Sequence, residues 1–440
     1  MTLSDWRQYV YKTQPDVVFA LTDTPFTPPP FSQKRIMRSI ERSVLWVADI
    51  LRPLSGEEDA GTSEPHSRHP LNVFVHMAGG TSLPAREAFA YALSETLHGP
   101  EAEAVKPLRC LDEGVAGYAF DLAVLRGIPP SPNTSQHQTL PEGFLQWERP
   151  DMLLQHPEAI AEVPTPSTTT ASNVVVSMAT SEPGATQSPD LGSLLRASLG
   201  TLSEQKPRLV TGVQSPHEVL RLIRDVGVDL FDVGWVIHGA NVGIGLDFVF
   251  PAPTRACDGD KVDTRQRLGH NLYDPIYTHQ FGRLADTLTG AGERAEGGST
   301  QQPVCPCVAC SPCTPSSHIL HSAVDQQSYR TDMEERYEKP YSRAYIHHLL
   351  HTHEMSAHTL LVAHNLAVVS VFLAGVRRVW VESGSARFAL EVERFSSAYD
   401  ESGELFIVAK KDWESVDRAR GKGRLGRERE KQRTDQNGDE

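Results

Sequence analysis

The sequence Cys305-Pro-Cys307-Val-Ala-Cys310 brings three thiols into six consecutive positions. Thiolate sulfur is a soft ligand, and a C-x-C-x2-C loop can wrap three sulfurs around one tetrahedral metal ion without strain. A fourth ligand is then required, and two residues qualify: the distant His364 and the nearby Cys313. The alternatives to a metal site are reduced cysteines in a flexible loop and a disulfide. Four cysteines within nine positions favour zinc.

A long helix is predicted after the cysteines, beginning at Ser342 with the sequence SRAYIHHLL and ending near Phe372, so that His364 lies late on it. Together with the cysteine spacing and the dipeptide His364-Asn365, this segment resembles the zinc subdomain of the tRNA-guanine (queuine) transglycosylase family. The zinc ligands that the resemblance implies are Cys305, Cys307, Cys310 and His364. The family has only a few residues between its last cysteine and the SRAY sequence, whereas residues 311–341 intervene here as a polar insertion. Because loop-closure entropy grows slowly with loop length, the insertion is compatible with the site.

The composition restricts the class of protein. The 440 residues carry 42 basic and 56 acidic side chains, a formal net charge of −14, which disfavours a protein that wraps nucleic acid by itself. With 31 prolines and 39% hydrophobic residues, part of the chain is expected to be unfolded. Six cysteines, four of them clustered, without a signal peptide indicate a reducing compartment. No apolar run is expected to span a bilayer, and the N-terminus does not resemble a transit peptide.

Strands and helices are predicted to alternate, as they do in β/α barrels. The predicted strands are residues 16–21, 71–76, 117–122, 206–212 and 227–232, with an extra strand at 245–250. The predicted helices are residues 33–51, 84–97, 191–202 and 215–223. Two of these segments, KPRLVTGV from Lys206 and GVDLFD from Gly227, resemble the same family and more specifically its eukaryotic accessory subunit. The expected fold is therefore an α/β, TIM-type barrel that lacks its N-terminal strands and contains an inserted zinc-binding subdomain.

Changes in composition divide the chain into segments. The stretch 129–190 is rich in Pro, Ser, Thr and Gln and has little hydrophobic periodicity, which predicts a disordered insertion. The expected organisation is an N-terminal part of the barrel at 1–128, the insertion at 129–190, a C-terminal part of the barrel at 191–283, a zinc-binding subdomain at 284–373, a closing segment at 374–412, and a charged disordered tail at 413–440.

Two predicted strand ends carry residues that suit a binding site. Asp23 follows the first strand, where a substrate-binding carboxylate would lie in a barrel, and a turn-forming role before Pro25 is equally compatible with the sequence. Gly79-Gly80 follows the second strand, and paired glycines let the backbone approach a ligand closely. The family uses such a pair against the base that it exchanges. The residues before the pair differ here, which favours a plain tight turn.

The resemblance implies that Asp232 occupies the position of the family's catalytic nucleophile, a carboxylate that forms a covalent intermediate with the ribose. Active members continue with proline, threonine and arginine, whereas this chain continues with Val233-Gly-Trp. The family's second carboxylate moves a proton on the departing and entering bases and lies in an Asp-Ser-Gly-Gly-Phe-Gln motif, which does not occur in this sequence. The expected role of Asp232 is therefore a cap at the end of a strand.

The function that the resemblance implies is that of a non-catalytic accessory subunit of queuine tRNA-ribosyltransferase. Its expected partner is a catalytic subunit, in a heterodimer that replaces guanine by queuine at the wobble position of tRNAs with GUN anticodons. One zinc ion per chain would be structural, and the helix after Ser342 would help to form the heterodimer face. The expected location is the cytoplasm, with peripheral association at the outer mitochondrial membrane. The alternatives are an active transglycosylase with Asp232 as nucleophile, and a zinc-dependent interaction module without an RNA role.

Overall fold

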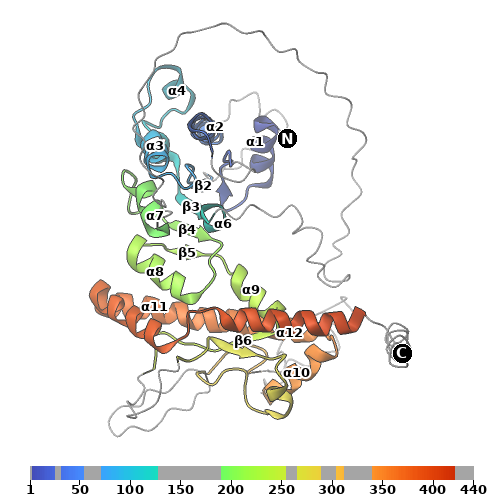
Figure 1. Ribbon diagram of the computed structural model, residues 1–440. Coiled ribbons are helices and arrows are strands. Elements are labelled where there is room, and N and C mark those ends of the chain that lie inside the picture. Colours follow the sequence, from blue (N-terminus) through green and yellow to red (C-terminus); the bar gives the residue numbers. More distant parts are fainter. Residues whose placement is uncertain are drawn as a thin grey trace, which may run out of the picture.

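The computed structural model describes residues 2–24, 31–53, 71–126, 190–253, 265–288, 304–311 and 339–421. Within these residues, five parallel strands form one sheet in the order β1-β2-β3-β4-β5, so that each strand pairs with the next one along the chain. The strands are β1 (Val18–Phe19), β2 (Val73–His76), β3 (Gly117–Asp121), β4 (Arg208–Thr211) and β5 (Leu230–Phe231). Figure 1 shows this sheet in the upper part of the molecule.

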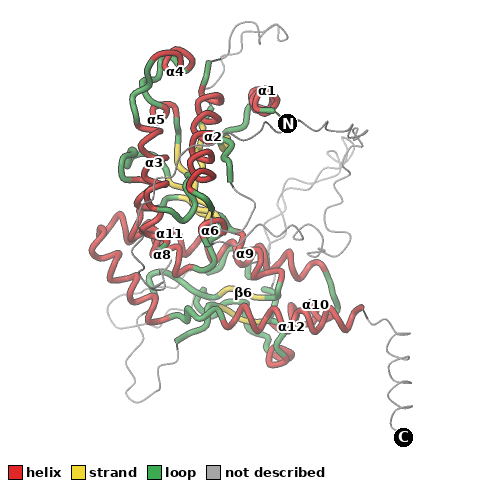
Figure 2. Tube along the Cα trace, turned by 45° about the horizontal axis from the view of Figure 1, so that its top comes forward, coloured by secondary structure: helices red, strands yellow, loops and turns green. Residues whose placement is uncertain are grey.

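Helices connect the successive strands and pack beside the sheet (Figure 2). The helices of this part are α1 (Leu3–Thr13), α2 (Gln33–Leu51), α3 (Leu83–Ser94), α4 (Gly99–Ala104), α5 (Leu111–Gly114), α6 (Leu122–Leu125), α7 (Leu191–Leu199) and α8 (Pro216–Val226). α2 begins where the Ser32 hydroxyl accepts a hydrogen bond from the backbone N–H of Arg35. It buries Ile40, Val47 and Ile50, so the apolar periodicity that predicted this helix faces the core.

The sequential parallel order confirms the expected α/β fold. A closed barrel is not present in the described residues, because β1 and β5 form the two edges of the sheet and do not pair with each other. The TIM-type prediction is therefore met only as an open five-stranded sheet. The two predicted insertions, 129–190 and 311–341, lie outside the described residues except at their ends.

A second group of elements lies below the sheet in Figure 1. They are α9 (Gly234–Asn241), the antiparallel strands β6 (Ile244–Leu246) and β7 (Gly269–Asn271), the 3-10 helix η1 (Pro275–His279), α10 (Arg343–His351), α11 (Met355–Ala398) and α12 (Glu404–Gly421). α11 contacts α8, α9, α10 and β6. It therefore joins the sheet to the region that holds the cysteines.

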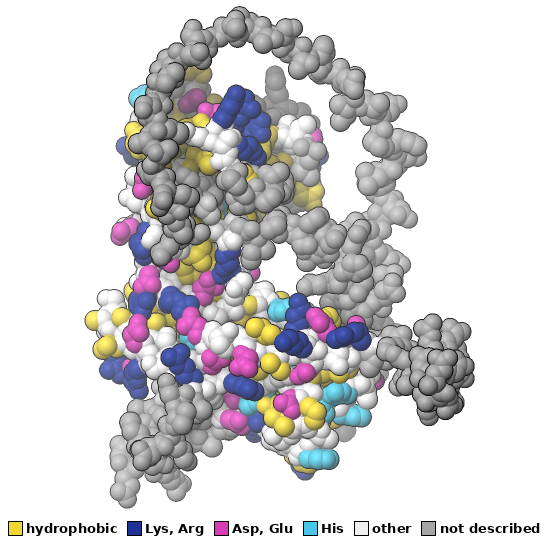
Figure 3. Space-filling model, viewed as in Figure 1, with side chains coloured by type: hydrophobic (Ala, Val, Ile, Leu, Met, Phe, Trp, Pro, Cys, Tyr) yellow, Lys and Arg dark blue, Asp and Glu magenta, His cyan; other side chains and the backbone are white. Residues whose placement is uncertain are grey.

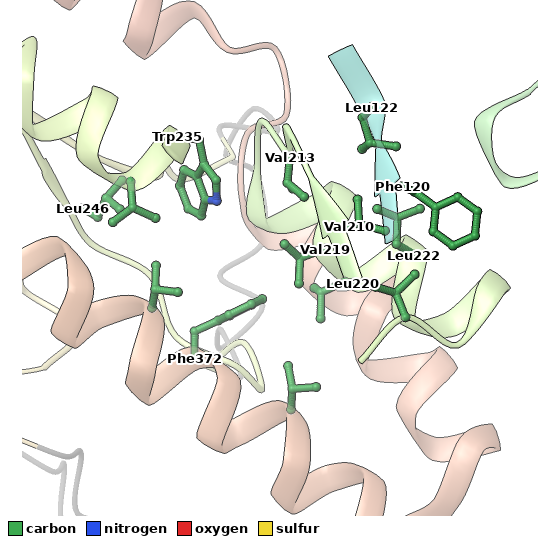
Figure 4. Packing of buried hydrophobic residues seen from close by; sticks show 14 of the residues in the cluster. Phe120, Leu122, Val210, Val213, Val219, Leu220, Leu222, Trp235, Leu246 and Phe372 are labelled. Atoms are coloured by element: carbon green, nitrogen blue, oxygen red, sulfur yellow. The ribbon is translucent and has the colours of Figure 1, made fainter. Parts of the chain in front are cut away.

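One hydrophobic core runs through both groups of elements. In Figure 4, Val219 and Leu220 of α8 lie between Val210 of β4 and Phe372 of α11. Phe248 stacks on Trp235 with ring centroids 6.3 Å apart and meets the edge of Phe372 at 5.4 Å. Burying an apolar or aromatic side chain of this size stabilises a fold by about 1.5–3 kcal/mol, so this core fixes α11 against the sheet.

The predicted single helix from 342 to 372 is wrong. The chain forms α10 and then α11, and the break between them contains His353 with a φ of 60°. A positive φ is unfavourable for a residue with a side chain and ends the helical geometry. The backbone N–H of Glu354 bonds back to the carbonyl of Leu349 and closes the turn.

The C-terminal segments also differ from the prediction. α11 extends to Ala398, although Gly384 with a φ of 71° interrupts its helical geometry. The predicted closing segment 374–412 is therefore the second part of α11 and the first part of α12. α12 continues to Gly421, so the beginning of the predicted disordered tail at 413–440 is helical, and the rest lies outside the described residues.

α11 corrects the expectation that no apolar run could span a bilayer. Among the helices of the described residues, it is the one that is long and apolar enough, by length and composition, to cross a membrane. Within this protein, 44% of its apolar window is buried, and the helix also buries the polar side chains of His364 and Asn365. Its contacts with α8, α9 and β6 account for its apolar composition.

Candidate metal centre

The three cysteines lie on a tight loop anchored at both ends by the backbone. The N–H of Cys305 donates to the carbonyl of Leu288 at 3.0 Å, and the N–H of Tyr341 donates to the carbonyl of Ala309 at 2.9 Å. The backbone N–H of Cys310 also lies 3.2 Å from the Cys307 sulfur and donates to it. This bond orients the Cys307 sulfur and favours its thiolate form.

His364 on α11 meets these thiols. Its Nδ1 lies 3.6 Å from the sulfur of Cys305, 3.7 Å from that of Cys307 and 3.4 Å from that of Cys310. A tetrahedral zinc ion, with Zn–S distances of about 2.3 Å and a Zn–N distance of about 2.0 Å, separates sulfur from nitrogen by about 3.5 Å. The four ligand atoms lie within 4.8 Å of one another, which is the arrangement that a Cys3His metal site requires.

The tautomer of His364 is fixed from behind. Its Nε2 lies 2.9 Å from the backbone carbonyl oxygen of Leu246, and a carbonyl can only accept, so Nε2 carries the hydrogen. The lone pair of a neutral imidazole is then on Nδ1, which faces the sulfurs. Metal-ligating histidines commonly donate their second N–H in this way, which fixes the ring and raises its basicity.

Charge balance in the cluster favours a bound cation. All four side chains are buried, and His364 is fully so. Hydrogen bonds with Cys305 and Cys310 lower the pKa of Cys307, while hydrogen bonds with Cys305 and Cys307 raise the pKa of Cys310. Burial lowers the pKa of His364, but hydrogen bonds with the Cys305 and Cys307 sulfurs outweigh that effect and raise it to about 9. Three neighbouring thiols cannot all ionise in a buried site without a cation, and a divalent metal ion supplies that charge.

Asn365 ties the centre to the strand beside it. Its amide oxygen accepts from the backbone N–H of Leu246 at 2.8 Å, and its amide nitrogen donates to the carbonyl of Ile244 at 2.9 Å and to that of Val236 at 3.3 Å. The side chain is fully buried. His364 and Asn365 therefore both form hydrogen bonds with the backbone of β6, so α11 cannot shift relative to β6 without breaking buried hydrogen bonds.

A polar network that the sequence did not reveal lies between β6, β7 and α10. The Oδ2 atom of Asp247 lies 3.0 Å from Nε2 of His270. Nη2 of Arg343 lies 2.8 Å from Oδ1 of Asp286 and 2.9 Å from Nε2 of His270. Asp247, His270 and Asp286 lie close enough to bind a cation. The Arg343 guanidinium already supplies a positive charge at this position, so the group forms an ion network. A pocket of about 320 Å³ opens beside it.

The other predicted site residues lie apart from the cysteine cluster. Asp232 is at the carboxyl end of β5, where its N–H donates to the carbonyl of Val210, and one of its carboxylate oxygens is buried without a hydrogen-bond partner in the described residues. Gly79 has a φ of 111°, and a Cβ there would lie 2.7 Å from the backbone nitrogen of Arg86. This close approach at the start of α3 accounts for the glycine as a turn residue. Cys313 lies outside the described residues.

The histidines of α10 contact the loop that follows β7. His347 Nδ1 lies 2.9 Å from the carbonyl of Leu272, and His351 Nε2 lies 3.2 Å from the carbonyl of Tyr273. Both nitrogens donate, because a carbonyl only accepts. These two histidines therefore anchor α10 to its own fold, and neither is close enough to the sulfurs to belong to the Cys3His cluster.

Comparison with known proteins places this fold and this cluster in context. The family model described as queuine tRNA-ribosyltransferase matches residues 175–400, which is more than half of the chain and includes all four residues of the cluster. The chain is 26% identical over 196 residues to the queuine tRNA-ribosyltransferase accessory subunit 2 of Ixodes scapularis, a match that covers 44% of this chain and 38% of the relative.

The proteins of the same name from two further organisms give similar values. The identity is 24% over 194 residues for Schizosaccharomyces pombe, covering 44% of this chain and 32% of the relative, and 26% over 207 residues for Danio rerio, covering 42% and 39%. The matched part of this chain thus spans 32% to 39% of the length of these relatives.

Proposed function

Because this chain belongs to the queuine tRNA-ribosyltransferase family, we propose that it is a non-catalytic accessory subunit of such an enzyme, which exchanges guanine for queuine at the wobble position of tRNAs with GUN anticodons. The observation that carries the proposal is the match to three relatives named accessory subunit 2. It is supported by the family-model match over residues 175–400, which includes the Cys3His cluster. The whole activity and its partners are part of the proposal, since the relatives are longer.

The proposed role of the metal centre is structural. Cys305, Cys307, Cys310 and His364 would hold one zinc ion, and a zinc ion with four protein ligands has no open position for a reacting water. Bound there, zinc supplies a cross-link between the cysteine loop and α11. The residues of this chain then do the positioning, because Leu246 and Asn365 fix the ring and the helix that face the loop.

The surroundings of Asp232 support a non-catalytic role. Base exchange requires a second carboxylate that moves a proton, and the family motif that carries it does not occur in this sequence. The unpartnered carboxylate oxygen of Asp232 is the one observation that favours the alternative, an active transglycosylase with Asp232 as nucleophile. A buried carboxylate oxygen without a partner is also compatible with a bound water.

An exposed apolar surface supports the proposed heterodimer. Phe281 is 78% exposed, and Ile276, Val308 and Tyr345 are also exposed. Ile276 lies in η1, Phe281 just after it, Val308 in the cysteine loop and Tyr345 in α10. Hydrogen bonds connect these segments, such as the bond from the N–H of Ala344 to the carbonyl of Gln280. Exposed apolar side chains on segments that are bonded to one another are typical of a protein interface. A catalytic subunit bound there would also meet the exposed side of α10.

A guanine-exchange assay on cognate tRNA tests the proposal. It compares this chain alone, a catalytic subunit alone and the two co-purified. Wherever this chain is present, it is tested as wild type, as Asp232→Ala and as the control Asp229→Ala. Asp229 lies before the first residue of β5, at the opposite end of the strand from Asp232. Activity in the mixture that both variants retain would support an accessory role. Exchange by this chain alone that Asp232→Ala abolishes and Asp229→Ala retains would replace the proposal with its alternative.

Location belongs to the same proposal. A cytoplasmic accessory subunit should co-fractionate with its catalytic partner, and association with the outer mitochondrial surface would be peripheral, through the complex. Carbonate extraction of isolated mitochondria measures this directly, because it releases peripheral proteins. A chain retained in the pellet after extraction would contradict a peripheral location.

A further inference from the structure

A stripe of cations runs along one side of α2. Lys34, Arg38 and Arg42 follow one another at intervals of four residues and are exposed, and Arg35 lies beside them. At 3.6 residues per turn, the four side chains fall within about a third of the helix circumference, and the i, i+4 spacing places successive cations about 6 Å apart along the axis. We call these four residues the α2 stripe. Figure 3 shows Lys and Arg side chains gathered in the region of α1 and α2.

Asp23 holds one edge of the α2 stripe in position. Its carboxylate accepts two hydrogen bonds from Arg35, at 2.8 and 2.7 Å, and a longer one from Arg42 at 3.3 Å. The Asp23 side chain is 11% exposed, and its N–H donates to the buried hydroxyl of Ser43. Asp23 is thus neither a free ligand nor a simple turn residue. It pre-orients two guanidinium groups, which lowers the conformational cost of binding an anion through them.

The position of the stripe in the fold matters as well. Asp23 follows β1, so its bonds to Arg35 place the first turn of α2 at the carboxyl end of the parallel sheet. That end is where β/α proteins bind their ligands. The stripe therefore begins at the end of the sheet at which the proposed function would place the tRNA.

Two members of the stripe have no ion-pair partner among the residues that the structure describes. Neither Lys34 nor Arg38 forms an ion pair within the described part of the chain. Four cations against Asp23 and the neighbouring Glu41 leave a local net charge of +2, in a chain whose net charge is −14. A local excess of positive charge on an acidic protein attracts a polyanion to that place.

The packing of α2 determines which polyanion fits. The apolar side of the helix, with Ile40, Val47 and Ile50, is buried in the core. The large apolar side chains exposed on α2 are Met37 and Leu45, and these two do not form the continuous apolar face that insertion into a membrane requires. A row of cations at regular spacing, without an insertable face, suits a row of phosphates. Phosphate contacts of this kind position a nucleic acid and supply much of its affinity.

We propose that the α2 stripe binds the phosphate backbone of tRNA and so makes this chain a direct contributor to substrate docking. The identity of the RNA rests on the proposed function. The contact itself is a property of this chain and can be measured without a catalytic subunit. It gives an acidic chain a local basic surface for RNA.

The test is binding of a fluorescent tRNA transcript to the full chain alone, measured by anisotropy over a series of salt concentrations. The stripe variant is Lys34→Gln/Arg38→Gln, which leaves the hydrogen bonds from Arg35 and Arg42 to Asp23 intact. The control variant is Arg377→Gln/Arg378→Gln, because both arginines are exposed on α11 and form no ion pair within the described residues. Both variants remove two charges, so they separate a local contact from the effect of net charge.

The stripe variant should bind several-fold more weakly, and its plot of log affinity against log salt should be shallower by about two, since each lost phosphate contact removes about one from the slope. The control should bind as wild type, and both variants should melt at the wild-type temperature. Wild-type affinity in the stripe variant, or equal losses in both variants, would overturn the proposal.

A second probe separates RNA from lipid. Vesicles of phosphatidylcholine with phosphatidylserine offer a surface of anionic headgroups to the same proteins. A stripe variant that loses vesicle binding but keeps tRNA binding would reassign the stripe to a membrane and overturn the inference. Failure of the guanine-exchange assay with a catalytic subunit would reject the proposed function and leave the tRNA-binding result standing.

Discussion

His364 donates its Nε2 hydrogen to the backbone carbonyl of Leu246 over 2.9 Å, while its Nδ1 faces three buried sulfurs. The strand β6 therefore determines which nitrogen of the ring is available to a metal. Because Asn365, the next residue, bonds to the N–H of the same Leu246, one residue of β6 receives both contacts. The Cys3His cluster and the packing of α11 on β6 are thus a single structural unit.

Loss of one sulfur ligand should remove the metal. We expect about one zinc per chain in the wild type after dialysis, and almost none in Cys310→Ser, because a hydroxyl is a poor substitute for thiolate at zinc. Elemental analysis by mass spectrometry measures the content, and thermal melting should show loss of stability, since metal binding contributes directly to folding. The control is Cys110→Ser, a free cysteine outside the cluster.

The same measurement decides between the two candidate fourth ligands. Cys313→Ser should retain zinc, whereas His364→Ala should lose it, because the His364 ring is held facing the three sulfurs. Retention of zinc in His364→Ala together with its loss in Cys313→Ser would mean that four thiolates form the site.

Replacing Asn365 should destabilise the region around β6. Asn365→Ala leaves one buried N–H and two buried carbonyls without their partner, and each unsatisfied buried group costs about 1–3 kcal/mol. We expect a decrease of at least about 2 kcal/mol in the free energy of unfolding, measured with urea. The matched control is Asn72→Ala, which removes a single exposed hydrogen bond to the carbonyl of Asp16 and should change stability by less than about 1 kcal/mol. Similar losses in the two variants would refute the coupling of α11 to β6.

Local sequence patterns predicted the elements whose physical cause is local. The apolar period of residues 33–51 predicted α2 with the bounds that the structure has, because a helix with a good N-cap and an unbroken period needs no distant information. The five strands of the sheet lie in the predicted segments but are shorter, since only the hydrogen bonds to neighbouring strands decide where a strand ends. The predicted strand 245–250 overlaps β6 only at its start, and β7 was not predicted. The C-x-C-x2-C spacing likewise predicts three ligands of the cluster, because they are close in sequence, but it does not identify the fourth.

Features that depend on distant contacts were missed. The break before α11 contains neither glycine nor proline, and the positive φ of His353 gives no signal in the sequence. The network of Asp247, His270, Asp286 and Arg343 draws on four segments spread along the chain, so no spacing motif could reveal it. The sequence is compatible with Asp23 as a ligand or as a turn residue, whereas its hydrogen bonds to Arg35 and Arg42 depend on the folded structure.

A side chain at Gly375 should separate α11 from the core. A Cβ at this position would overlap the backbone carbonyl oxygen of Phe250, and backbone cannot move aside as the end of a flexible side chain can. Gly375→Ala should therefore lower the free energy of unfolding by about 3 kcal/mol. Gly200→Ala is the control, because its Cβ would meet its nearest neighbour only at 3.9 Å and its backbone is right-handed. A Gly375→Ala protein as stable as the control would show that α11 lies farther from Phe250 than described.

Asp247 should make the stability of the protein depend on pH. Burial disfavours its charged form, but hydrogen bonds from His270, from Thr287 and from the N–H of Asp286 outweigh burial and lower its pKa. A carboxyl group with a lowered pKa in the folded state stabilises the fold above its unfolded pKa of about 3.9 and loses that contribution as the pH falls through the folded value.

The variant Asp247→Asn removes this dependence. It should lower the free energy of unfolding by about 1–3 kcal/mol at pH 7, because an amide presents its NH2 group to donors that the carboxylate accepts. Below about pH 4 the difference from wild type should shrink, since the wild-type carboxyl then takes up a proton on unfolding. Urea unfolding at pH 7, 5 and 3.5 measures both quantities. A difference that persists unchanged at pH 3.5 would mean that the fold does not stabilise the ionised form of Asp247. The Asp247 side chain would then be neutral within the network around Arg343.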